Sequence, residues 1–283
     1  MNDPEIKSAP VAAARDAIRK PQLMIPVTAQ DMDRERRRRT MKWLGVALAA
    51  ILAGGIVYKR VADPGNAREA FDAGMRLVTA TRYDQAIMNF NRAVDLQPNF
   101  ADAYRMRGRA YVAESNADQA IRDFTRVFEL RPSDALALAE RGFARLDKRD
   151  YANAIADADR ALALDPKLAR AYSLRGTARR AAGDPRKAVE DFTKAVELEL
   201  NLDNLFQRAA TNQLIGEHEM AIADFTKALV EDPQQPHTYF ARAKSRNAVG
   251  DTAGAQADIA AGRKIDGWYK AKSADELRSR RGG

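Results

Sequence analysis

Apolar residues recur at helical spacing along most of the chain from Ala67 onward. In one representative stretch this pattern predicts two amphipathic helices, over Ala101–Ala113 and Ala117–Leu130. Pro132 follows the second helix and is expected to end it, because proline cannot donate a backbone hydrogen bond. The same order of helix, turn, helix and proline returns along the chain, so the pattern predicts an all-α protein built from one helix-turn-helix unit.

The unit returns at a nearly fixed step of about 34 residues. A small residue recurs at Gly74, Gly108, Gly142, Gly176, Ala209 and Ala243, and an alanine follows it at Ala86, Ala120, Ala154, Ala188, Ala221 and Ala255. Most units also carry a phenylalanine (Phe90, Phe124, Phe192 and Phe225) and a closing proline (Pro98, Pro132, Pro166 and Pro233). The small residues are expected where two helix backbones approach closely. One unit buries too little apolar surface to stand alone, so we expect the units to stack.

This step and its small, alanine, phenylalanine and proline positions resemble the tetratricopeptide repeat, a helix-turn-helix unit. The resemblance implies a right-handed α-solenoid of about six repeats over residues 67–267. The fourth copy departs from the pattern, with Leu200 in place of the proline and a one-residue deletion after it. The sixth carries Ile259 and Gly267 in place of the phenylalanine and the proline. We therefore expect looser stacking after the fourth copy, and a capping helix and tail over residues 268–283.

A different pattern precedes the repeats. Residues 43–61 are apolar and free of charge through Tyr58, and they follow a basic cluster that begins at Arg34 and ends at Lys42. A helix that includes the flanking residues is about 31 Å long, close to the roughly 30 Å hydrocarbon core of a bilayer. Trp43 and Tyr58 stand where interfacial aromatic residues belong. The pattern predicts one transmembrane helix over residues 43–61.

The charge bias around this segment predicts its orientation. More basic residues precede the span than follow it, so residues 1–42 are predicted to be a disordered basic cytoplasmic tail. The repeats would then lie in the periplasm, anchored in a bacterial inner membrane through a linker at residues 62–66. Cleavage after Ala47-Leu48-Ala49 is the alternative, but the triplet lies within the apolar run and the leader is long, so an uncleaved anchor is favoured.

Composition removes several functional classes. The chain has no cysteine, which excludes disulfides, thiolate nucleophiles and cysteine zinc sites. His218 and His237 are its only histidines, they lie in different copies, and no glycine-rich phosphate loop is present. We therefore predict no catalytic activity, cofactor, metal or small-molecule substrate. The formal charge of +8 is concentrated outside the repeats, whose own charges nearly cancel, so nucleic acid is not an expected partner.

Charged residues also recur in step with the repeat. An arginine precedes the small residue at Arg107, Arg141, Arg175, Arg208 and Arg242, and an aspartate recurs on the second helix at Asp123, Asp157, Asp191, Asp224 and Asp258. The arginines could form a track for an acidic ligand, or each could pair with the aspartate of its own copy. The second interpretation is favoured, because a ligand rarely repeats with the array.

Binding is expected to use positions that vary between copies. In the proteins that this chain resembles, the first helix of each repeat lines a concave groove. The matching variable positions here are Phe71, Met75, Arg105, Arg109, Phe143, Ser173, Thr177, Phe206, Phe240 and Lys244. Exposed phenylalanine and methionine beside arginine suit an extended peptide with apolar side chains and some acidic character. The alternative, that these aromatic residues are ordinary core between repeats, stays open.

The carboxylate clamp of chaperone-binding relatives, a Lys-Asn-Asn-Lys-Arg set, is not found at the matching first-helix positions, so a chaperone C-terminus is not an expected ligand. The sequence predicts a membrane-anchored scaffold or adaptor that binds proteins or extended peptides, with a chaperone-like or assembly role in the cell envelope. The alternatives are a non-catalytic accessory subunit of a membrane enzyme complex and an adaptor whose repeats face the cytoplasm.

Overall fold

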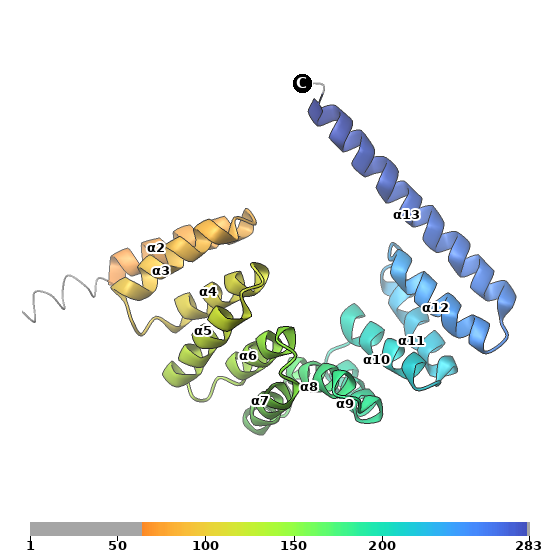
Figure 1. Cartoon of the computed structure of the whole chain (residues 1–283), viewed down its shortest axis with the longest axis horizontal. Coiled ribbons are helices and arrows are strands. Elements are labelled where there is room, and N and C mark those ends of the chain that lie inside the picture. The colour runs from red at the N-terminus through yellow and green to blue at the C-terminus, as the bar shows by residue number, and fades with distance from the viewer. Residues whose placement is uncertain (1–63, 282–283) are drawn as a thin grey trace, which may run out of the picture. The chain divides into compact units, whose positions relative to one another are not determined.

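The computed structural model describes residues 64–281, with side chains through Gly267, and this part of the chain forms twelve α-helices and no strand. The helices pair into six consecutive repeats (Figure 1). In chain order the pairs are α2 (Pro64–Thr79) and α3 (Tyr83–Leu96), α4 (Ala101–Ala113) and α5 (Ala117–Leu130), α6 (Ala135–Asp147) and α7 (Tyr151–Leu164), α8 (Ala169–Ala181) and α9 (Pro185–Leu198), α10 (Leu202–Leu214) and α11 (His218–Glu231), and α12 (Pro236–Ala248) and α13 (Thr252–Arg281). The predicted all-α helical-repeat solenoid is confirmed.

We call the first helix of each repeat helix A and the second helix B. Each helix packs against the helices that precede and follow it in the chain, so the repeats stack in sequence order. Helices A of neighbouring repeats also contact one another, as α6 does with α8 and α10 with α12, whereas helices B of neighbouring repeats meet less. Helices A therefore form one continuous face, which we call the inner face (Figure 1).

The recurring small residues lie against phenylalanine rings. A Cβ atom added at Gly108 would lie 2.9 Å from the Phe124 ring of helix B, and that ring is fully buried. The same relation holds in two further repeats, for Gly74 with Phe90 and for Gly176 with Phe192. The two helices of a repeat can approach this closely only because no side chain separates the helix A backbone from the ring.

In the third repeat a different side chain fills the space beside the small residue. It carries Ala158 where its neighbours carry phenylalanine, and a Cβ atom at Gly142 would overlap the side chain of Leu174 instead. Leu174 belongs to α8, which is helix A of the next repeat, and it is fully buried. In this repeat the small residue therefore contacts the following repeat rather than its own helix B.

The last repeat differs from the others at a position that packs against the next repeat. Four residues after the phenylalanine position, helix B of repeats 1 to 5 carries an apolar side chain: Val94, Phe128, Leu162, Val196 and Leu229. Phe128 and Leu162 pack against the start of the next repeat. The equivalent residue of α13 is Arg263, which is exposed. A charged side chain at this position leaves the last repeat with a polar outer surface, as a solenoid end requires.

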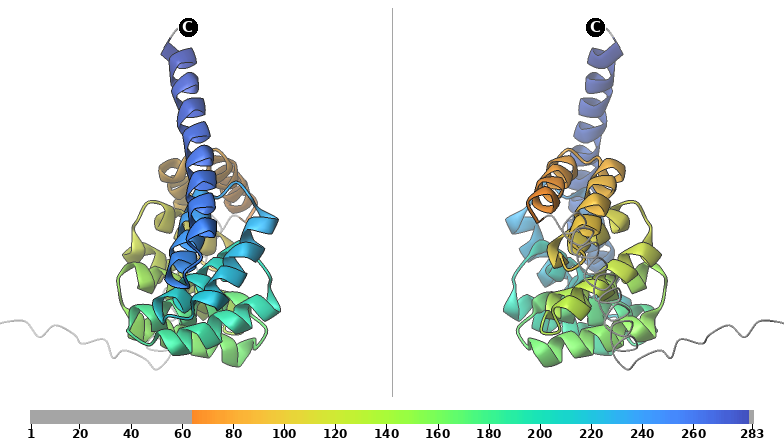
Figure 2. Two further views of the ribbon diagram at one scale, coloured as in Figure 1. Left: turned by 90° about the vertical axis from the view of Figure 1, so that its right-hand side faces the viewer. Right: turned by 90° about the vertical axis from the view of Figure 1, so that its left-hand side faces the viewer.

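Two predicted boundaries differ from the structure. The predicted linker at residues 62–66 overlaps α2, which already begins at Pro64. Proline suits the first turn of a helix, because a backbone N–H at that position would have no partner within the helix. The predicted separate helix over residues 268–283 is instead the continuation of α13, which runs unbroken from Thr252 to Arg281 (Figure 2). Gly267 occupies the position at which a proline ends most earlier repeats. Unlike proline, glycine keeps its backbone N–H and can donate the helical hydrogen bond, so it weakens the helix but does not end it.

The predicted location in a bacterial inner membrane, with periplasmic repeats, is contradicted. Within residues 64–281 no helix is both long enough and apolar enough to cross a bilayer. The longest of them, α13, carries charged residues along its length. The predicted tail at residues 1–42 and the predicted span at residues 43–61 lie outside the described residues.

Candidate protein-binding surface

The recurring arginines and aspartates form ion pairs within each repeat. Arg141 donates two hydrogen bonds to Asp157, from Nη2 at 2.6 Å and from Nε at 2.9 Å, and both side chains are buried. The same pairing joins Arg107 with Asp123, Arg175 with Asp191, Arg208 with Asp224, and Arg242 with Asp258. The prediction that each arginine pairs within its own copy is confirmed, so these arginines do not form a track for an acidic ligand.

The pairing of Arg107 with Asp123 favours the charged form of its guanidinium group. Burial lowers the pKa of Arg107, but its hydrogen bonds to Asp123 raise it, and the net direction of the pKa shift is upward. Two parallel hydrogen bonds between guanidinium and carboxylate also fix the orientation of both side chains. Each pair therefore holds helix A against helix B at a defined angle.

The same arginines connect each repeat to the one before it. Nη1 of Arg141 donates to Thr125 Oγ1 of α5 at 3.2 Å. Equivalent bonds join Arg107 to Asn91, Arg175 to Asp159, and Arg242 to Thr226. Across the described part of the chain Arg208 is the exception, since it makes no such bond to Thr193 of α9. The junction between repeats 4 and 5 lacks a link that the other junctions have.

In repeats 2 and 3 the polar positions of the inner face are already paired with one another. Nε of Arg109 donates to Glu140 Oε1 at 2.6 Å, and Arg105 pairs with Asp134 and with Glu140. Glu140 is only 3% exposed, so its charge depends on these two arginines. Both arginines were predicted to contact a ligand. The structure places both in contacts between successive repeats, and the Arg109 side chain stays 45% exposed.

The predicted residues of the first repeat are also largely engaged. Phe71 is 8% exposed and its ring lies 5.8 Å from the ring of Phe90 and 5.1 Å from that of Phe100, measured between centroids. Met75 is half-buried and packs against the same cluster. These two side chains are part of the hydrophobic core at this end of the stack.

The last two repeats present more of their predicted residues to solvent. Phe206 is half-buried, with its ring centroid 5.5 Å from that of Phe225 and 5.1 Å from that of His237. Phe240 is 39% exposed, and Lys244, one turn further along α12, is exposed. The inner face of repeats 5 and 6 therefore offers an aromatic ring beside a cation.

The middle of the inner face contains a hollow of about 290 Å³. Its lining consists of Phe143, Arg170, Ser173, Glu199, Asn201, Asp203 and Asn204, and we call this space the inner-face hollow. Two of the predicted residues, Phe143 and Ser173, are brought together here. A third, Thr177, is turned toward its own helix, where its hydroxyl donates to the backbone oxygen of Ser173 at 2.8 Å.

The inner-face hollow exists because of two local departures from the repeat. Ser173 stands where helix A of repeats 1, 2, 5 and 6 carries phenylalanine or arginine, so the space that a large side chain would fill is open. The connector from α9 to α10 has three residues, 199–201, whereas four residues separate every other pair of successive repeats. Asn204 compensates for the short connector, because its Nδ2 donates to the backbone oxygen of Glu199 at 3.0 Å.

The sequence-based selection missed the residues that this connector contributes. Glu199, Asn201 and Asp203 were not among the predicted groove positions, since they lie at or before the start of α10. The absent proline at Leu200 was the available signal, because it marks the one connector whose length differs.

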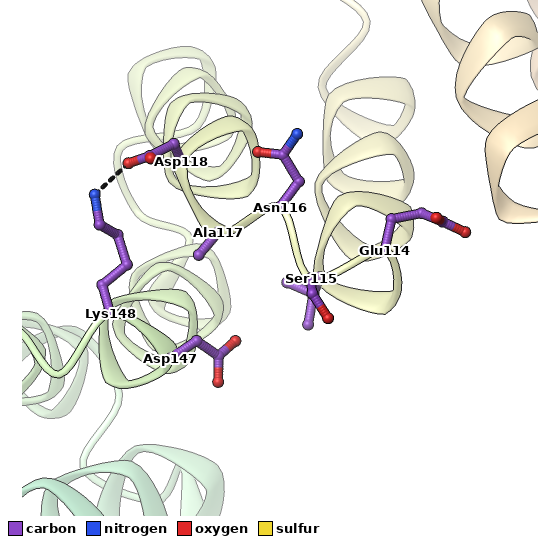
Figure 3. Close-up of a pocket in the computed structure, with 8 residues that line it drawn as sticks. Glu114, Ser115, Asn116, Ala117, Asp118, Asp147 and Lys148 are labelled. Atoms are coloured by element: carbon purple, nitrogen blue, oxygen red, sulfur yellow. Dashed lines mark hydrogen bonds and ion pairs between the residues drawn. The ribbon is translucent and has the colours of Figure 1, made fainter.

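A second hollow lies at the turn ends of repeats 2 and 3, away from these residues (Figure 3). It is wide, at about 790 Å³, and its walls are mostly polar, as the labelled side chains Glu114, Asn116, Asp118 and Asp147 show. Lys148 pairs with Asp118 across it. Burial raises the pKa of the Asp147 carboxyl. Within residues 64–281 no group of three histidine, aspartate or glutamate side chains is placed to hold a metal ion.

Paired helices in six stacked copies, joined by repeating ion pairs and presenting one face of helices A, define an α-helical repeat protein. Family models described as tetratricopeptide repeat match residues 71–121, 105–169 and 169–201. The resemblance seen in the sequence is therefore confirmed as tetratricopeptide repeats over residues 71–201. No curated protein matches the chain in sequence.

Several solved structures share the fold. PilW, described as a widely conserved type IV pilus biogenesis factor, superposes with a TM-score of 0.62 at 20% identity, covering 68% of this chain and 90% of PilW. A thermophilic tetratricopeptide repeat protein of Thermus thermophilus gives 0.55 at 19%, covering 65% and 98%. YrrB, described as having an unusual peptide-binding site, gives 0.50 at 19%, covering 62% and 91%. At these identities the likeness shows the fold alone.

Proposed function

We propose that this chain is an interaction scaffold that binds a protein or an extended peptide on its inner face, over repeats 3 to 6. The observation that carries the proposal is the unequal state of the inner-face side chains. Arg105 and Arg109 pair with Glu140 of the next repeat, although the Arg109 side chain stays 45% exposed. The inner-face hollow is open, and Phe240, whose ring lies against Gly262 of α13, is still 39% exposed.

Two general properties of the fold support this proposal. Tetratricopeptide repeat proteins bind protein or peptide partners, and YrrB, which shares the fold, is described as having a peptide-binding site. A stack of repeats also presents a long, rigid surface, which lowers the conformational cost of holding an extended ligand. Recognition would then combine an aromatic contact at Phe240 with polar contacts at the inner-face hollow.

The test begins with selection of random linear peptides on the full chain, followed by fluorescence anisotropy with labelled peptides. A Phe240→Ala, Lys244→Ala double variant is expected to weaken binding by about tenfold or more, because a buried aromatic anchor is typically a hot spot. Met88→Ala with Met220→Ala is the matched control, since both side chains are exposed on helices B. Peptides that bind the inner-face variant as tightly as the unmodified chain would place the site elsewhere.

A further inference from the structure

Three phenylalanines occupy equivalent positions of the inner face. Phe71, Phe206 and Phe240 each stand three residues before the small residue of helix A, in repeats 1, 5 and 6. The ring of Phe71 lies 5.1 Å from the ring of Phe100, measured between centroids. The ring of Phe206 lies 5.1 Å from the ring of His237. Both covering rings belong to the start of the following helix A, since Phe100 directly precedes α4 and His237 lies in the first turn of α12.

Repeat 6 gives Phe240 no such cover. Within the described residues no repeat follows α13, which continues as one helix to Arg281 instead of leading into a further helix A (Figure 1). Phe240 is accordingly 39% exposed, against 8% for Phe71. An aromatic ring therefore stays partly open at the point where the stack ends.

The helix that carries Phe240 does not cover it either. Arg68, three residues before Phe71, lies over the Phe71 ring at 5.2 Å from its centroid. The equivalent residue of repeat 6 is His237, three residues before Phe240, and its ring is paired with Phe206 of the preceding repeat. Both covers that Phe71 has are thus missing from Phe240.

One side of the Phe240 ring is nevertheless fixed by packing. A Cβ atom added at Gly262 of α13 would lie 2.9 Å from this ring. Helix B of the other repeats carries alanine or valine at the position of Gly262: Ala93, Val127, Ala161, Ala195 and Ala228. The missing side chain lets the ring lie close to the backbone of helix B. A ring that is positioned before a ligand binds costs less conformational entropy on binding.

We propose that the exposed side of Phe240 binds an aromatic side chain of a peptide partner. This inference rests on the proposed function, because it names the side chain that the same surface takes. The ligand ring would stand in for the ring that the following repeat supplies in repeats 1 and 5, so it continues the contact between repeats past the end of the stack. Aromatic rings in tilted or edge-to-face contact attract one another beyond the apolar area that they bury.

The absence of cysteine from the chain allows a direct test, because one introduced thiol reports on one place. Lys244→Cys puts a thiol one turn along α12 from Phe240. The full-length variant is equilibrated with cysteamine disulfides that carry a phenylacetyl, a cyclohexylacetyl or an aminobutyryl group, in the presence of mercaptoethanol. Intact-protein mass spectrometry then gives the fraction of each mixed disulfide.

The phenyl compound is expected to be retained about two- to tenfold more than the cyclohexyl compound, which has a similar size but no aromatic ring. Equal retention of these two, or stronger retention of the cationic aminobutyryl compound, would overturn the assignment. In Lys244→Cys with Phe240→Leu the phenyl preference should disappear, because an apolar side chain remains but the ring is gone. Lys227→Cys, at an exposed lysine of α11, is the matched control and should show no preference.

The tethering experiment needs no peptide, so its outcome is independent of the test of the proposed function. If selected peptides bind the inner face but the phenyl compound is not preferred, this inference fails while the proposed function stands. If the phenyl compound is preferred at Phe240 but no selected peptide binds the inner face, the aromatic site stands while the proposed function fails.

Discussion

Leu174 of one repeat occupies the space above Gly142 of the repeat before it, the space that a phenylalanine of the same repeat occupies elsewhere in the stack. The third repeat lacks that phenylalanine and has Ala158 in its place, fully buried. A side chain from the next repeat has therefore replaced a side chain from the same one. The substitution converts a contact within a repeat into a contact between repeats, and so it couples repeats 3 and 4.

Gly142→Leu is expected to lower the free energy of unfolding by about 3 kcal/mol or more, because the new side chain overlaps Leu174 in a packed core. Urea unfolding of the full chain measures the change. Ala181→Leu is the control, since Ala181 is exposed near the end of α8. An unchanged unfolding midpoint for Gly142→Leu would contradict the contact. Leu174→Ala should also destabilise, by about 2–5 kcal/mol, through the cavity that it creates.

Replacing two aromatic residues of the inner face is expected to have different effects, one mainly on stability and the other mainly on peptide binding. Phe206→Ala should mainly lower the melting temperature, because its ring packs on Phe225. Phe240→Ala should mainly weaken capture of a peptide, because Phe240 is 39% exposed, although one side of its ring lies against Gly262 of α13. Thermal unfolding and fluorescence anisotropy of the same two variants give the comparison. A large loss of stability in Phe240→Ala would return this ring to the core and remove it from the binding surface.

The threonines that face the recurring arginines provide a matched series. Thr125, Thr193 and Thr226 each donate to the backbone oxygen four residues earlier, but only Thr125 and Thr226 also accept a bond from an arginine of the next repeat. Thr125→Ala and Thr226→Ala should therefore cost about 1 kcal/mol more than Thr193→Ala. Denaturant unfolding of the three variants measures the difference, and equal costs would show that the arginine bonds add no stability.

Because Arg208 makes no bond to Thr193, the junction between repeats 4 and 5 is expected to open most readily. Amide hydrogen exchange is expected to be faster over residues 199–208 than over residues 131–141, the matching stretch at the junction between repeats 2 and 3. Uniform protection across these two segments would contradict the prediction.

Ion pairs within a repeat and between neighbouring repeats give stability a defined pH dependence. The hydrogen bond from Arg131 lowers the pKa of Asp102, and the hydrogen bond from Lys148 lowers the pKa of Asp118. A carboxyl whose pKa is lower in the folded state stabilises that state above its unfolded pKa of about 4, and the contribution is lost as the pH falls through the folded pKa. The urea midpoint should fall on acidification below about pH 4, and less steeply in Asp102→Asn.

The sequence by itself determined the repeat and most of what lies inside one repeat. The helices predicted at Ala101–Ala113 and Ala117–Leu130 are α4 and α5 with the same ends. The pairing of arginine with aspartate was also predicted correctly. Both follow from periodicity. A contact between two positions of one repeat recurs in the other copies, so the common spacing of the two residue types predicts it.

Only the tertiary structure decided what the variable residues do. Arg105 and Arg109 pair with the next repeat, Leu174 fills a space left by Ala158, and α13 continues past Gly267. The inner-face hollow is lined by side chains from three repeats, brought together by a short connector and a small residue at Ser173. Such contacts occur once rather than in every copy. Their partners depend on how neighbouring repeats pack, and the spacing of residues along the chain carries no information about that packing.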